Sequence, residues 1–328
     1  MTAISVLDLM MIGEGRTFSD TMDGALALAR HVEKHGFKRY WVAEHHNMPG
    51  IASSATTLIM SHLASGTGNL RIGSGGVMLP NHSPLIVAEQ FATLDTMYPK
   101  RIDLGVGRAP GGDSPTTMAV RGGSAMSRDF AEDVQLLSDY LADNGRSSVR
   151  GVPGRHDVPI WILGSGMYGA ALAARRGLPF AFASHFAPAM LKPALAHYRE
   201  NFCPSKYLER PYVMAGVNVF AADTHEEAEF LASSHRQWVA GMQAGCPGLL
   251  PRPVEGFMDS LPEARRRVVE QELTYTAIGS PEKVGSWLRE FIDYFGVDEL
   301  MIDARIYDLE KRCRSYELAA KAILDLII

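Results

Sequence analysis

PIWILGSGMYGAALAARR, residues 159–176, contains one complete strand–turn–helix unit. Its apolar run 159–163 has the length of a buried strand, and 167–176 has the pattern of a helix. The small residues Gly164, Ser165 and Gly166 lie between the two. Consecutive parallel strands need a crossover helix, so this unit predicts a parallel sheet that is covered by helices.

The same order of elements recurs along the whole chain. Strands are expected at 5–12, 39–43, 70–79, 101–106, 159–163, 179–183, 212–221 and 299–303. The helices that follow them are expected at 19–35, 54–65, from 84 onward, 128–143, 167–176, 188–201, 224–242 and 310–326. Eight such units predict an α/β fold, a (β/α)8 TIM barrel that spans 1–328 as a single domain. An open doubly wound sheet is the alternative, but the GxGxxG pattern that usually follows its first strand is absent.

Composition narrows the class of protein. The chain has 328 residues, of which 46% are hydrophobic and 21% charged, which is enough for a large core. Its net charge of -5 gives no basic footprint for nucleic acid. The three cysteines, Cys203, Cys246 and Cys313, form no CxxC pair, so we expect a reducing, cytoplasmic location. No secretory leader is expected, because no basic leader precedes an apolar run and Asp8 interrupts the start. No membrane span is expected either, because the longest stretch without Asp, Glu, Lys or Arg, 45–70, is rich in serine, threonine and glycine.

Two connections are longer than the others. Residues 107–126 contain RAPGGD and RGG, and residues 243–262 are rich in proline and glycine. Long irregular segments on a barrel often cover the active site. We therefore expect a lid after the seventh strand, with an ordinary surface loop as the alternative.

The active site of such a barrel lies where the strands end. Glycine, serine, histidine and charged residues lie in the second half of several expected strands or just after them: Glu44, His45 and His46; Gly75 and Gly76; Gly107 and Arg108; Gly164, Ser165 and Gly166; Ser184 and His185; Asp303 and Arg305. A metal site is disfavoured, because adjacent residues of a strand, such as His45 and His46, point to opposite faces. We expect no metal.

Two patterns instead indicate a ligand that carries a phosphate and a flat ring. Gly164, Ser165 and Gly166 leave backbone N–H groups open at a helix N-terminus, which favours an anion, and Arg108 can add a fixed charge. Tight packing at the turn and a surface role for Arg108 are the alternatives. Gly75 and Gly76 would let a flat ligand approach the backbone, or they mark a bulge. Together these patterns suggest flavin mononucleotide (FMN).

The chain also resembles a known family. WVAEHHNMPG (41–50), the block from RIGSGGVML to GVGRAPGGD (71–113), PIWILGSGMYGAALAARRGLPFAFA (159–183) and GVDELMID (296–303) are similar to the bacterial luciferase-like flavin-dependent monooxygenases of the single-polypeptide type. The resemblance covers nearly the whole chain. It implies reduced FMN and O2 as reactants, a flavin hydroperoxide, and a small organic substrate such as an aldehyde. It also implies a separate flavin reductase and a homodimer.

The resemblance assigns roles to individual residues. His45 matches the family's catalytic histidine near the reactive edge of the flavin. Gly75 and Gly76 match the strand behind the ring, where the family can carry a cis peptide bond. Arg108 and the turn Gly164–Gly166 match the phosphate contacts.

Two positions depart from luciferase itself. Gly107 replaces a reactive cysteine beside the flavin, so light emission is not expected. Ser165 and Gly166 stand where luciferase has an acid and then a serine, which preserves backbone contacts to a phosphate but not necessarily side-chain contacts. Two other functions stay open: a deazaflavin-dependent oxidoreductase, and a non-catalytic flavin-binding protein.

Overall fold

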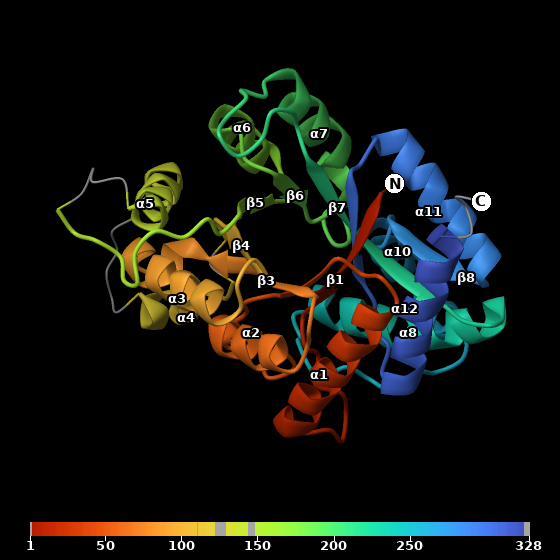
Figure 1. Cartoon of the computed structure of the whole chain (residues 1–328). Helices are drawn as coiled ribbons and strands as arrows, with labels where there is room; N and C mark the ends of the chain where they lie inside the picture. Colours follow the sequence, from red (N-terminus) through yellow and green to blue (C-terminus); the bar gives the residue numbers. More distant parts are fainter. Residues whose placement is uncertain (1, 110, 122–128, 144–147, 325–328) are drawn as a thin grey trace.

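The computed structural model describes residues 2–109, 111–121, 129–143 and 148–324. Eight parallel strands close into a barrel with helices around it (Figure 1). The barrel strands are β1 (Ala3–Asp8), β2 (Arg39–Val42), β3 (Arg71–Met78), β4 (Ile102–Gly107), β5 (Ile160–Gly164), β6 (Phe180–Phe182), β7 (Val213–Ala221) and β9 (Glu299–Asp303). Pairing of β6 with β7 and of β9 with β1 closes the ring. The predicted (β/α)8 barrel and all eight predicted strands are confirmed.

A ninth strand, β8 (Thr276–Gly279), was not predicted. It pairs with the second half of β7, from Asn218 to Ala221. On its other side, Asn218 pairs with Asp303 of β9. Strand β8 therefore lies on the edge of β7 opposite β9, which is the edge that β6 occupies near the start of β7. The long strand β7 therefore belongs to the barrel in its first half and to an outer extension in its second half.

Helices cover the outside of the barrel. They are α1 (Phe18–Lys34), α2 (Thr56–Ser65), α3 (Pro84–Met97), α5 (Phe130–Ala142), α6 (Met167–Arg176), α7 (Leu191–Glu200), α8 (His225–Gln243), α11 (Pro281–Phe295) and α12 (Leu309–Leu324). Shorter elements are α4 (Ser114–Val120), α9 (Phe257–Ser260), α10 (Glu263–Glu272) and the 3-10 turns η1 (Leu79–Asn81) and η2 (Pro188–Met190). The start expected at residue 128 and the end expected at residue 326 lie outside the described residues.

The helix ends follow local chemistry. At the start of α1, Thr17 and Asp20 form a capping box, in which each side chain accepts a hydrogen bond from the other residue's backbone N–H. At its end, Gly36 has a φ of 79°, which a glycine adopts without strain. The side chain of Thr224 accepts a hydrogen bond of 3.2 Å from the backbone N–H of Glu227, which starts α8.

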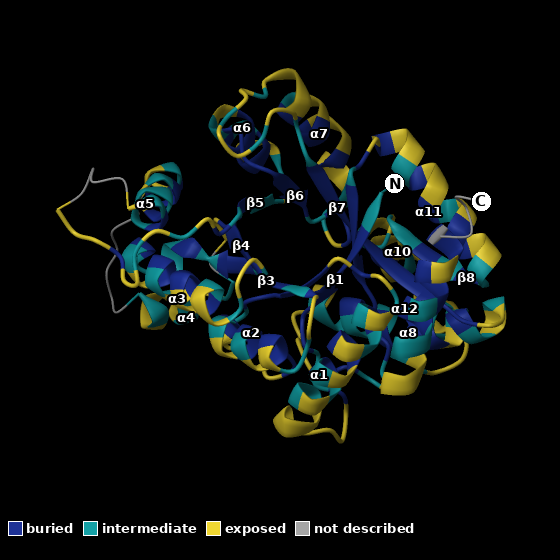
Figure 2. Cartoon of the chain, viewed as in Figure 1, coloured by how far each residue is buried: buried dark blue, intermediate teal, exposed yellow. Residues whose placement is uncertain are grey.

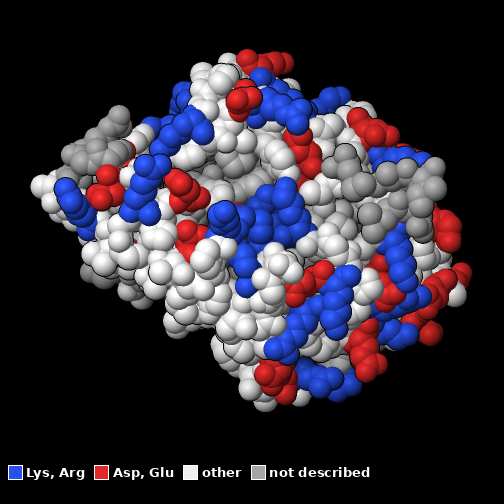
Figure 3. All heavy atoms as spheres, in the orientation of Figure 1, with Lys and Arg blue, Asp and Glu red and all other residues white. Residues whose placement is uncertain are grey.

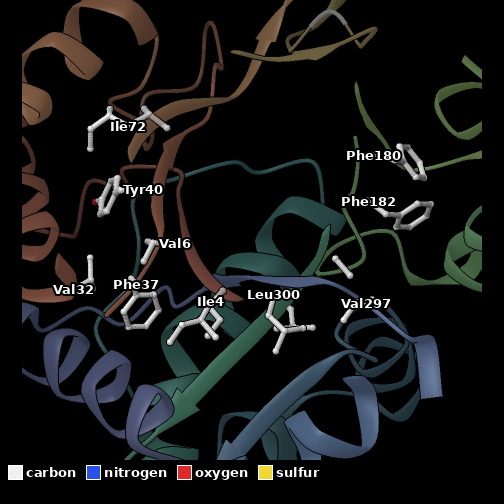
Figure 4. Packing of buried hydrophobic residues seen from close by; sticks show 14 of the residues in the cluster. Ile4, Val6, Val32, Phe37, Tyr40, Ile72, Phe180, Phe182, Val297 and Leu300 are labelled. Atoms are coloured by element: carbon white, nitrogen blue, oxygen red, sulfur yellow. The ribbon is translucent and has the colours of Figure 1, made fainter. Parts of the chain in front are cut away.

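The core has two layers. Outward-facing residues of the strands pack against the helices, as Val6, Tyr40 and Ile72 do beside Val32 of α1 (Figure 4). Inward-facing residues fill the barrel, where the rings of Trp41 and Trp161 meet edge to face at 5.3 Å. Burial follows the same division, since the helices are buried toward the barrel and exposed on their outer faces (Figure 2). Within the described part of the chain, no helix is both long and apolar enough to span a membrane.

Buried ion pairs close the barrel below the tryptophans. Arg39 donates to Asp103 at 2.7 Å and to Glu299 at 2.9 Å, and both acids are fully buried. On the surface, charges of both signs surround a central group of basic side chains on the face turned to the viewer (Figure 3). The carboxyl ends of the strands, by contrast, surround a cavity.

Candidate active site

The cavity at the carboxyl ends of the strands has a volume of about 650 Å³. All eight barrel strands, or the residues directly after them, contribute to its wall. The start of α6, one face of α8 and the end of α10 complete it. The eight residues to which the sequence analysis assigned catalytic or cofactor-binding roles all line this one cavity: His45, Gly75, Gly76, Gly107, Arg108, Gly164, Ser165 and Gly166. Their chemical roles stay predictions.

Strand β3 presents bare backbone to the cavity. The peptide bond between Gly75 and Gly76 is cis, and the register with β4 shifts between Ser74 and Val77. A Cβ atom on Gly76 would lie 2.8 Å from the carbonyl oxygen of Gly105, and one on Gly75 would lie 2.7 Å from the side chain of Leu7. The glycines are therefore needed for packing within the barrel, and the same choice of residue leaves the wall flat.

Small residues and a cation meet at the mouth of the cavity beside β4 and β5. Gly166 is the N-cap of α6 and makes no side-chain cap, and a Cβ atom there would meet nothing within 4 Å. The guanidinium carbon of Arg108, an exposed residue, lies 4.3 Å from the centre of the Tyr168 ring. Free N–H groups of a helix start, open space and a positive charge together suit a phosphate group.

Gly107 ends β4 in the wall between these two features. A Cβ atom here would lie 3.5 Å from the sulfur of Met78, an ordinary contact. Unlike Gly75 and Gly76, this glycine is not required by packing. A side chain at this position would occupy the cavity.

His45 faces the cavity from the loop after β2. Its Nδ1 is buried and has no hydrogen-bond partner among the residues that the structure describes, and its backbone N–H donates to Ser53 O at 3.1 Å. Burial, reinforced by the positive charge of Arg305, lowers the pKa of His45 to about 4. The ring is therefore neutral at pH 7 and holds one N–H donor and one acceptor.

Glu44 and His46 flank His45 and turn away from the cavity. Glu44 Oε1 accepts hydrogen bonds from Nε2 of His46 at 2.9 Å and of His82 at 2.8 Å. Its Oε2 accepts from the backbone N–H of Met78 at 3.1 Å. Burial alone would raise the pKa of Glu44, but these hydrogen bonds outweigh it and hold the pKa below its usual value. Glu44 therefore ties the loop after β2 to the end of β3, and His46 has a structural role.

A second group of polar residues lines the far side of the cavity. Its members are His185 after β6, His235 and Trp238 on α8, and Arg305 after β9. The sequence indicated His185 and Arg305 only as residues near strand ends, and it gave no indication of His235 and Trp238. His235 continues the buried stripe of Ala228, Leu231 and Ala232 at helical spacing, which is the one signal that could have found it.

The segment 243–262, expected to form a lid, contributes no residue to the cavity wall. It packs instead on the loop after β1, where Leu250 N donates to Ile12 O at 2.8 Å and Glu14 N donates to Leu250 O at 3.0 Å. The residues that line the cavity are on either side of it, Met242 before and Glu272 and Leu273 after. The cover on this side therefore comes from α8 and the end of α10.

Comparisons with known proteins agree with this architecture. Residues 4–299 match the family model described as luciferase-like monooxygenase. The chain is 48% identical over 322 residues to a luciferase-like monooxygenase of Escherichia coli strain K12, covering 97% of this chain and 96% of that one. It is 32% identical over 340 residues to an N-acetyl-S-alkylcysteine monooxygenase of Bacillus subtilis strain 168, covering 99% of each.

A solved structure gives the same result. The structure of apo-MsnO8 superposes with a TM-score of 0.88 at 32% sequence identity and covers 99% of both chains. Sequence and structure agree over the whole barrel, including the strands that carry the cavity wall. The chain belongs to the luciferase-like monooxygenase family.

Proposed function

We propose that this protein is a monooxygenase that uses reduced FMN and O2 to oxygenate a small organic substrate. The observation that carries the proposal is that one cavity is lined by Arg108 and the start of α6, by the bare backbone of Gly75 and Gly76, and by the neutral ring of His45. Its volume of about 650 Å³ lies within the range of pockets for ligands of this size.

The residues fit FMN at one end of the cavity. Arg108, Ser165 and Gly166 would hold the phosphate, with the backbone N–H groups at the start of α6 directed at it. The bare backbone of Gly75 and Gly76 would lie against the ring. Bound there in its reduced form, FMN supplies the electrons that activate O2.

His45 has the protonation state that this chemistry needs. Because its pKa is about 4, the ring does not carry a positive charge at pH 7, and it can donate one proton or accept one at Nε2. The apolar side chains of Trp41, Met214 and Met301 form the floor of the cavity. They exclude water from the reacting atoms, which disfavours loss of activated oxygen.

Partners follow from the same proposal. A separate reductase would supply reduced FMN, since the chain lacks a nicotinamide-binding fingerprint. A homodimer through α1 to α3 is supported by exposed apolar side chains on these helices, among them Leu58 (72% exposed) and Ile86 (53% exposed). The name of the relative that is 32% identical makes N-acetyl-S-alkylcysteines the first substrates to try.

The first test is anaerobic titration of the protein with reduced FMN, followed by oxygen. Tight binding and incorporation of one atom of isotopically labelled oxygen into an added substrate would support the proposal. Binding of a reduced deazaflavin but not of FMN would contradict it. Tight binding of FMN with no product from a broad panel of substrates would favour a non-catalytic protein.

The phosphate assignment has its own test. Arg108→Ala should weaken FMN binding by about tenfold or more, since a hydrogen bond to a charged group contributes about 1.5–3 kcal/mol. Riboflavin, which lacks the phosphate, should bind the variant and the parent protein equally. An equal loss for both ligands would assign Arg108 to the ring or to the fold instead.

A further inference from the structure

We propose that Arg305, together with His185 and His235, binds the carboxylate of the substrate, and that the enzyme therefore selects small carboxylic acids. This inference rests on the proposed function, because it assigns the substrate's side of the same cavity. It is carried by the position of Arg305, by its unused donors and by the two buried histidines beside it.

Arg305 and Arg108 stand on opposite sides of the barrel. Arg108 is the first residue after β4, and Arg305 lies two residues after the end of β9. The strand order around the ring is β1-β2-β3-β4-β5-β6-β7-β9, so β4 and β9 are four strands apart in a barrel of eight. If the phosphate of one ligand is bound beside Arg108, Arg305 on the opposite side is available to bind a second ligand.

Arg305 keeps donors available toward the cavity. It is only 4% exposed, yet it lines the cavity wall. Its Nε donates a hydrogen bond of 2.8 Å to Oδ2 of Asp303, and its Nη2 lies 2.7 Å from the same oxygen in an ion pair. Its guanidinium carbon lies 4.8 Å from the centre of the Trp238 ring. Nη1 makes no hydrogen bond with any residue that the structure describes, although a guanidinium has five N–H donors.

Two histidines beside Arg305 also lack partners. His185 is 5% and His235 is 1% exposed, and the Nδ1 atom of each is buried and makes no hydrogen bond with a described residue. Their Nε2 atoms make no hydrogen bond within the described ranges either. Burial lowers the pKa of His185 to about 4 and that of His235 well below its usual value, and Arg305 contributes to both shifts. Both rings are neutral at pH 7. Because their Nδ1 atoms are buried in the protein, the Nε2 atoms are the ones that a ligand in the cavity can reach.

The charges around this group favour an anion. Among the described residues of the cavity wall, the permanently charged ones are Arg108, Arg305 and Glu272. Glu272 accepts a hydrogen bond from Gln243. Asp303 accepts a hydrogen bond from Arg305 and is not part of the cavity wall. The free edge of a guanidinium matches the two oxygens of a carboxylate, and two neutral imidazoles can add N–H donors. Met214, Met301 and Val239 offer apolar contacts for the rest of such a substrate.

The test measures binding, without turnover. Three acids are compared with their primary amides by calorimetry on the FMN-loaded protein: N-acetyl-S-methylcysteine, N-acetyl-S-benzylcysteine and hexanoic acid. We expect at least one acid to bind tenfold or more tightly than its amide. Arg305→Lys, which keeps a positive charge beside Asp303, should remove most of this preference and leave the affinity for FMN unchanged. Arg108→Lys is the matched control and should weaken FMN instead.

The outcomes separate the two proposals. If no acid binds more tightly than its amide, or if Arg305→Lys keeps the full preference, the carboxylate subsite is wrong even where FMN binding and oxygen incorporation are normal. If FMN does not bind, the proposed function fails. The acid preference can then still be measured on the flavin-free protein, where its presence would support the subsite and its absence would overturn it. Thermal unfolding of each variant shows whether the fold is intact.

Discussion

Glu44 and His46 are joined by a hydrogen bond of 2.9 Å that turns both side chains away from the cavity, while His45 between them faces into it. The alternation of side chains along an extended segment produces this arrangement. Two adjacent histidines therefore have different surroundings, one with a carboxylate partner and one without. This difference makes them a matched pair for mutagenesis.

His45→Ala should keep FMN binding and lose oxygenated product, with oxygen reduced to peroxide instead. The reason is that the variant removes a proton-handling group from the cavity wall and leaves the phosphate end intact. The ratio of product formed to oxygen consumed measures the effect, and we expect it to fall at least tenfold. His46→Ala is the control and should change stability more than this ratio. Full coupling in His45→Ala would remove His45 from the catalytic residues.

Stability should fall in mild acid because buried histidines must take up protons on unfolding. The pKa of His45 and of His185 is about 4 in the folded protein, against 6.5 for an ordinary histidine. The unfolded chain therefore binds more protons between these values. Stability is fully present above pH 6.5 and is lost as the pH falls toward 4, by up to about 1.4 kcal/mol per pH unit for each group.

Urea unfolding between pH 6.5 and 5 would measure this slope above the range in which most carboxylates titrate. His185→Gln should make the slope shallower, and the surface variant His62→Gln should not. An unchanged slope in His185→Gln would mean that His185 is not buried in its neutral form.

Arg39→Met should destabilise the fold by about 3–5 kcal/mol, since removing one partner of a buried ion pair leaves an uncompensated charge. Arg39 contacts both Asp103 and Glu299, and neither acid is exposed. Arg267→Met is the control, because Arg267 and its partner Glu263 are both exposed and the pair should contribute little. Equal midpoints of denaturation for Arg39→Met and the parent protein would show that these buried ion pairs do not stabilise the barrel.

Gly76→Ala and Gly107→Ala should differ strongly. A Cβ atom at position 76 would lie 2.8 Å from a backbone oxygen, whereas one at position 107 would make an ordinary contact of 3.5 Å. We expect the first variant to unfold at a markedly lower temperature and the second to keep the melting temperature of the parent. Gly107→Ala should also change the affinity for FMN or substrate, because its methyl group enters the cavity. Similar melting temperatures for the two variants would contradict the packing argument for Gly76.

Local patterns were sufficient to predict the barrel, and long-range packing explains what they missed. The eight barrel strands are apolar runs with turn residues after them, so each is visible by itself. Strand β8 has four residues and pairs with the second half of β7. No local pattern in the sequence indicates this pairing. Thr224 was identifiable as a helix start because its partner lies three residues away.

The same distinction applies to the candidate site. The residues predicted from sequence, such as His45 and Gly166, lie close to the carboxyl ends of strands, so the rule that barrel sites lie at strand ends finds them. His235 and Trp238 lie on a helix whose position over the cavity depends on tertiary packing. Whether the ring nitrogens of His185 and Nη1 of Arg305 find hydrogen-bond partners among the described residues depends on the three-dimensional packing around them. A single sequence does not contain that information.

The two halves of strand β7 support different parts of the protein. Its first half is locked between β6 and β9, whereas its second half supports β8 and the insertion that carries α8 and α10. Trp238 and Leu273, which follow β7 in the chain, line the same cavity as the turn after β5. A chimaera that exchanges the segment from α8 to α10 between relatives should therefore take this wall of the cavity from one parent and the β4–β5 wall from the other.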